Sequence, residues 1–65
     1  MYQTCICPKD EIYHINKRTI AEAKTVALEY YPAALFMEVV ECLQIAIYDR
    51  TETGLEHIGN IWKVA

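Results

Sequence analysis

TIAEAKTVALEYY, residues Thr19–Tyr31, is the stretch that decides the fold. From Ile20 onward six side chains recur with the period of an α-helix and fall within an arc of roughly 140° at 100° per residue: Ile20, Ala23, Val26, Ala27, Tyr30 and Tyr31. Thr19 and Glu22 have the spacing of a capping box, in which a hydroxyl and a carboxylate satisfy amides of the first turn. Pro32 disfavours helical geometry at Tyr31. The pattern therefore predicts one helix over Ile20–Tyr31.

The residues before this helix predict a β-hairpin. Tyr2–Cys7 is rich in strand-forming residues, and Glu11–Ile15 (EIYHI) alternates in the manner of a second strand. Pro8–Asp10 lies between them as a polar turn.

After the helix, the apolar period changes from 3.6 to about 2, which favours strands. We expect two strands, Phe36–Glu41 and Gln44–Arg50, joined by a tight turn at Cys42–Leu43. That turn lacks Gly, Asn and Asp, so one long bulged strand is the alternative. Thr51–Gly54 reads as a turn, and Ile58–Val64 as a last strand.

The predicted element order is β-β-α-β-β-β. It corresponds to a single small α+β domain over residues 1–65, with one helix packed on a mainly antiparallel sheet. The sheet residues expected to face the helix are Ile6, Val39, Ile45 or Ile47, and Trp62 or Ile61. The sequence leaves the choice within each pair open.

Composition excludes several classes of protein. The chain has 65 residues, of which 54% are hydrophobic and 23% are charged, so it is too apolar for a disordered chain. There is no serine, which excludes a serine nucleophile, and only two glycines, so there is no glycine-rich phosphate loop. No stretch resembles a signal peptide or a membrane span. We expect a cytoplasmic protein with no membrane partner.

The cysteines and histidines offer one alternative function. Three cysteines, an odd number, do not predict a disulfide scaffold and suit a reducing compartment. Cys-x-Cys on a strand is an unusual spacing for structural zinc. We expect no metal, no cofactor and no catalytic residue. A small metal-binding or redox protein remains the alternative, with Cys5, Cys7, Cys42, His14 and His57 as its candidate residues.

A second alternative is a small regulatory nucleic-acid-binding protein that uses Lys17, Arg18 and Lys24 near the helix start. The net charge of -3 argues against it, because such proteins usually carry a positive excess. Direct nucleic-acid binding is therefore not expected.

Acidic residues concentrate in the second part of the chain. Residues 1–24 have four basic and three acidic side chains, whereas residues 25–65 have two basic and six acidic ones. A surface of this kind can dock against a basic groove, and tyrosine supplies contact area at interfaces. The predicted partner-binding residues are Glu29, Glu38, Glu41, Asp49, Glu52, Glu56, Tyr31 and Tyr48.

Aromatic residues are numerous for so small a core: five tyrosines, one phenylalanine and one tryptophan. A sheet covered by one helix leaves one face open, and apolar side chains there favour a partner. The sequence therefore predicts self-association, as a homodimer, or binding to another protein.

The helix start Thr19-x-x-Glu22-Ala23-Lys24 and the ending Gly59-x-x-Trp62 complete a pattern over residues 11–65. The pattern resembles small phage-encoded anti-CRISPR proteins of type I systems. The resemblance implies a stoichiometric, non-catalytic inhibitor that binds a CRISPR surveillance complex in the host cytoplasm and blocks nucleic-acid access. The cysteine-rich first strand and the acidic second half depart from the pattern, so no functional residues are carried over. With a net charge of only -3, acidic steering of an ordinary protein interface is favoured over DNA mimicry.

Overall fold

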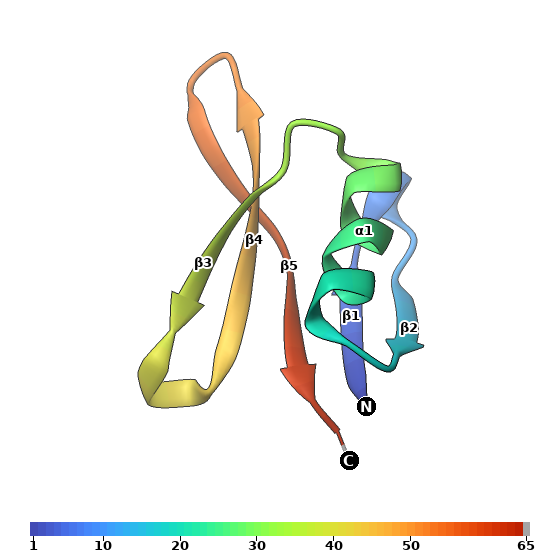
Figure 1. Ribbon diagram of the computed structural model, residues 1–65. Helices are drawn as coiled ribbons and strands as arrows, with labels where there is room; N and C mark the ends of the chain where they lie inside the picture. Colours follow the sequence, from blue (N-terminus) through green and yellow to red (C-terminus); the bar gives the residue numbers. More distant parts are fainter. Residues whose placement is uncertain (65) are drawn as a thin grey trace.

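Residues 1–64, the part that the computed structural model describes, form five strands and one α-helix (Figure 1). The elements follow one another as β1 (Tyr2–Ile6), β2 (Tyr13–Lys17), α1 (Ile20–Tyr30), β3 (Leu35–Val39), β4 (Gln44–Thr51) and β5 (Gly54–Lys63). Short 3₁₀ turns, η1 (Pro8–Asp10) and η2 (Val40–Cys42), join β1 to β2 and β3 to β4. The predicted α+β class and the order β-β-α-β-β-β are confirmed.

All strands belong to one antiparallel sheet with the order β2-β1-β5-β4-β3. The last strand, β5, lies in the middle, between β1 and β4. Helix α1 packs on β1, β2 and β5, while β3 and β4 lie to one side of it (Figure 1). The helix therefore covers only one part of the sheet.

The helix begins where the sequence predicts. The Thr19 hydroxyl accepts a hydrogen bond from the Glu22 amide at 3.1 Å and donates one to the Glu22 carboxylate, also at 3.1 Å. At the other end, Tyr31 has non-helical backbone angles, φ -133° and ψ 84°, and its amide still bonds to the Ala27 carbonyl. The helix ends at Tyr30, one residue earlier than predicted, because the residue before Pro32 avoids helical geometry.

Most strand boundaries differ from the prediction by one or two residues, and the start of β5 differs by four. β2 begins at Tyr13 rather than at residue 11, because Lys9 and Asp10 adopt positive φ and the turn extends through Glu11, whose amide bonds to the Pro8 carbonyl. β5 begins at Gly54 rather than at residue 58, because the hairpin with β4 closes on the pair Thr51–Gly54.

The region after the helix forms two strands rather than one, as preferred from the sequence. β3 and β4 pair in register from Leu35 opposite Tyr48 to Val39 opposite Gln44. The chain reverses through η2 and through Leu43, which has left-handed backbone angles of φ 52° and ψ 41°. A leucine occupies the position where turns usually have Gly or Asn.

The core lies between α1 and the sheet. Ile6, Ile47 and Ile61 are fully buried and contact the small residues Ala23 and Ala27, which allow close approach of the helix. Thr4 is also buried, and its hydroxyl donates to the Ala23 carbonyl at 2.9 Å, so β1 is tied to α1 by a satisfied polar contact.

The pairing register of the strands shows which of the predicted residues face the helix. Ile45, Ile47 and Ile61 all face the helix, and Trp62 therefore lies on the open face. The placement of Val39 on the helix side was wrong. Phe36 packs against the core, and alternation along β3 then puts Val39 on the open face.

Candidate partner-binding surface

An apolar groove opens on the helix side of the sheet, at the end where β3 turns into β4. Its volume is about 410 Å³. The start of α1, strands β1, β4 and β5, and the η2 turn all contribute to its walls. The apolar side chains that line it include Tyr2, Ile20, Val40, Leu43, Ile45 and Ile61. We call it the turn groove.

The two most exposed large apolar side chains belong to this groove. Val40 is 77% exposed and Leu43 is 82% exposed. Leu43 also lines a second hollow beside Trp62 on the other side of the turn, so it stands between the two. A left-handed conformation costs a residue with a side chain about 1–2 kcal/mol. The fold therefore keeps Leu43 exposed at a position where glycine would be unstrained.

Charged groups border the turn groove. Glu38 of β3 and Lys63 of β5 line it, and Glu41 lies within η2. Two of the predicted partner-binding acids, Glu38 and Glu41, thus lie at this end of the sheet.

Three other predicted acids lie towards the opposite end. Asp49 and Glu56 are directly opposite one another on β4 and β5, and Glu52 lies in the turn between these strands. Asp49 is four residues along β4 from Ile45, the cross-strand partner of Glu38, a separation of about 13 Å. The structure divides the acidic residues between two ends of the sheet.

Of the two predicted tyrosines, only Tyr31 lies beside this second acidic group. Burial raises the pKa of Tyr31, and the neighbouring Cys7, Asp49 and Glu56 raise it further. Tyr48 lies on the open face, and its ring is 5.3 Å from that of His57. The side chain of Tyr31 therefore lies near Asp49 and Glu56. The side chain of Tyr48 lies on the other face of the sheet.

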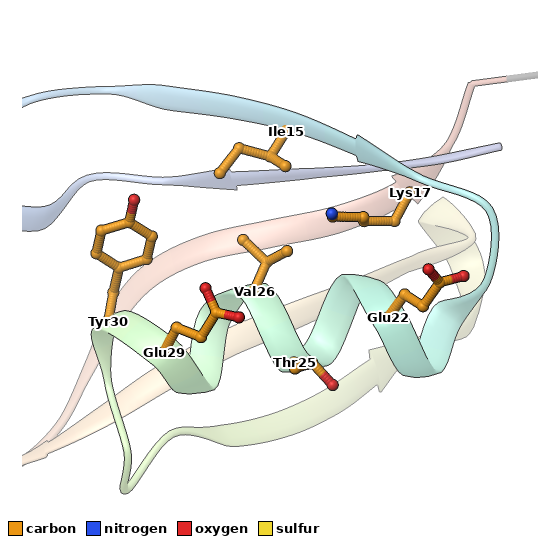
Figure 2. A pocket seen from close by; sticks show the side chains of 7 residues that line it. All are labelled: Ile15, Lys17, Glu22, Thr25, Val26, Glu29 and Tyr30. Atoms are coloured by element: carbon orange, nitrogen blue, oxygen red, sulfur yellow. The ribbon is translucent and has the colours of Figure 1, made fainter.

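The remaining predicted acid, Glu29, lies apart from both groups. It lines a cleft of about 330 Å³ between α1 and β2, together with Glu22, Thr25 and Lys17 (Figure 2). The Lys17 side chain extends from β2 into the space beside the helix (Figure 2).

The predicted basic cluster is not one surface. Lys17 lies on edge strand β2, whereas Lys24 reaches towards the other edge of the sheet. Its ammonium lies 5.4 Å from the centre of the Phe36 ring of β3, a cation–π contact.

The candidate metal ligands are also dispersed. The Cys5 sulfur is 4.0 Å from Nε2 of His14 on the open face, and Nδ1 of that histidine lies 3.2 Å from the Gln3 side-chain oxygen. Cys7 follows β1, and Cys42 lies in η2. Within residues 1–64, no three side chains of the metal-binding types gather at one point.

The sequence pointed to the acids but not to the turn groove. Ile20, Val40 and Leu43 lie on different elements, and only the folded chain brings them together. A signal was present, however, because the turn at Cys42–Leu43 lacks the residues that turns prefer.

No helix among residues 1–64 combines the length and the apolar character needed to cross a bilayer. Comparison with protein families, with curated proteins and with solved structures found no significant similarity for this chain.

Proposed function

We propose that this chain is a non-catalytic interaction protein that binds a protein partner through the turn groove. The exposed, strained Leu43 carries this proposal. Backbone strain of this kind concentrates at functional sites, and an exposed leucine there contributes little to the core. Placed in a partner's pocket, the same side chain would bury apolar area, which favours association.

In this proposal the acidic side chains at the two ends of the sheet orient the partner. Asp49 and Glu56 face each other directly across two strands, an arrangement that destabilises a sheet because like charges repel. A basic surface on the partner would neutralise this pair and speed association. Glu41, beside the turn groove, would act in the same way at the other end.

The partner class that we propose is a type I CRISPR surveillance complex, inhibited by a phage-encoded or mobile-element protein in the host cytoplasm. This step is supported by the resemblance of the helix start and the last strand, Thr19 to Lys24 and Gly59 to Trp62, to anti-CRISPR proteins. Binding near the path of guide or target would block nucleic-acid access without any chemical step.

The direct test measures binding of labelled target DNA to purified type I surveillance complexes with and without excess protein. We expect loss of DNA binding or of nuclease recruitment for at least one complex. Leu43→Asn keeps a residue that tolerates left-handed angles but removes the apolar contact, so it should weaken inhibition at least tenfold. Leu55→Asn changes an exposed leucine at the other end of the sheet and serves as the matched control.

A charge-reversal series tests the acidic surface. Asp49, Glu52 and Glu56 changed together to Lys should abolish inhibition while leaving the fold intact, whereas Lys17→Glu with Arg18→Glu should change little. Loss of inhibition in the basic-residue variant, with tolerance at the acids, would show that the other face binds. Failure to affect any type I complex would reject the proposed partner class.

A further inference from the structure

Strand β3 is an unprotected edge of the sheet. The two edge strands are β2 and β3. Natural edges are usually blunted by charged or polar side chains, because a bare edge recruits another strand. β2 fits this rule with the polar side chains of His14, Asn16 and Lys17, whereas the five residues of β3, LFMEV, include one polar side chain, that of Glu38. Met37 at the centre of β3 is 56% exposed.

We propose that β3 pairs antiparallel with β3 of a second copy, around a two-fold axis at Met37. The two sheets then form one continuous ten-stranded sheet, and both helices lie on the same side. In this register Leu35 lies opposite Val39 of the second copy, and Phe36 lies opposite Glu38 of the second copy. This inference concerns self-association alone and does not depend on the proposed partner.

The strand itself selects the register. Met37 is the middle residue of Leu35–Val39, so an axis there pairs every residue of the strand. An axis at Glu38 would put two carboxylates directly opposite each other, which destabilises a pair of strands. An axis at Phe36 would put Glu38 and Val39 opposite residues 34 and 33, which lie outside the strand.

The charges near β3 complement one another in this register. Lys24 of α1 lies over the Phe36 ring, 5.4 Å from its centre. Directly opposite residues of an antiparallel pair have Cβ atoms about 4.5–5.5 Å apart. Glu38 of the second copy, opposite Phe36, therefore comes within reach of the Lys24 ammonium. The two-fold axis repeats this contact, so each interface contains two Glu38–Lys24 pairs.

The apolar side chains of β3 are satisfied at the same time. On the open face, Leu35, Met37 and Val39 of the two copies form one stripe, with Met37 beside its own symmetry mate. Leu35 and Met37 are exposed in the single chain, and this contact covers them.

Sedimentation equilibrium of the whole chain tests the dimer. At about 0.1 mM, where dimers with micromolar constants are formed, we expect a mass twice the chain's 7.5 kDa. Met37→Lys places two ammonium groups at the axis and should give the monomer mass with an unchanged circular dichroism spectrum. Glu41→Lys, an acid on the turn outside β3, is the matched control and should remain dimeric.

Charge complementation tests the register. Glu38→Lys alone and Lys24→Glu alone should each weaken self-association at least tenfold, because each homodimer then contains two like-charge contacts. A mixture of the two variants should restore a dimer, since both contacts become Lys–Glu pairs. A monomeric parent chain, or a dimer that persists in Met37→Lys, would overturn the proposal. Dimers of both single variants with no preference for mixing would overturn the register.

Discussion

Leu43 lowers the stability of the fold, while its side chain is the one that we propose to bind the partner. Its left-handed backbone costs about 1–2 kcal/mol, while glycine loses roughly 0.5–1 kcal/mol through its greater freedom in the unfolded chain. Leu43→Gly should therefore raise the free energy of unfolding by up to about 1.5 kcal/mol in urea denaturation. Leu55→Gly, within a strand, should lower it. A loss of stability in Leu43→Gly would mean that the exposed side chain contributes more to the fold than its strain costs.

Two tyrosine hydroxyls have environments that favour the protonated form. The Tyr13 hydroxyl donates to the Glu11 carboxylate at 2.6 Å, and this bond, together with the negative charge, raises the pKa of Tyr13. Burial is the main cause that raises the pKa of Tyr31. Both shifts stabilise the folded chain below pH 10, the value of an ordinary tyrosine, and this stability is lost as pH rises through the raised values.

Absorbance at 295 nm, which reports tyrosinate, measures this effect. We expect some of the five tyrosines to titrate above pH 10 in the folded protein. Glu11→Gln removes the carboxylate charge and should lower the pKa of Tyr13 towards 10. Glu52→Gln, in the distant β4–β5 turn, should leave the curve unchanged. An identical effect of both variants would mean that the Glu11–Tyr13 bond does not form in solution.

At the scale of the element, the close packing of β5 against β1 requires a glycine, Gly59. Gly59 lies opposite Ile6 of β1 and Ile47 of β4, and a Cβ atom there would overlap the backbone carbonyl oxygen of Cys5. β5 also has a bulge at Ile58, which has no cross-strand partner between the pairs at Gly59 and His57. The centre of the sheet therefore has no room for a side chain at this position.

Gly59→Ala should destabilise the protein by at least about 2 kcal/mol, because backbone atoms rather than a flexible side chain must move. At Gly54 an added Cβ would meet open space, but φ is +135°. Gly54→Ala therefore measures the cost of backbone strain without the cost of a steric overlap. Urea denaturation of both variants gives the comparison. A Gly59→Ala protein as stable as the parent would show that β1 and β5 lie farther apart than described.

The helix and the strands differ in how well their boundaries could be predicted from nearby residues in the sequence. Helix α1 was predicted to within one residue because Thr19, Glu22 and Pro32 act over a few positions. The start of β5 was missed because Gly54–His57 is exposed and becomes a strand only by pairing with β4. The start of β2 was missed because Lys9 and Asp10 adopt positive φ without being glycines. The turn groove was missed for a similar reason, since residues far apart in sequence form its walls.

At the scale of the whole molecule, the small core leads us to expect that self-association adds to stability. A chain of this length buries only about 60% of its unfolded surface, and the helix covers only part of the sheet. Self-association through β3 would add buried area and make stability depend on protein concentration. A tenfold rise in concentration should then raise the Tm by about 5 °C in calorimetry. The Tm of Met37→Lys should not change with concentration, and a constant Tm for the parent chain would contradict the dimer.

The central position of β5 has a consequence for the time at which the protein can fold. β5 pairs with β1, the first strand of the sheet, across almost the whole sequence, from Tyr2 opposite Lys63. Until β5 joins the sheet, β1 and β2 have no strand that links them to the β3–β4 hairpin. Ile6 and Ile47 remain without their shared neighbour Gly59 until then. The sheet is therefore completed only when β5 is available, and because its decisive contact closes so long a loop, we expect folding to be slower than that of a helical protein of equal length.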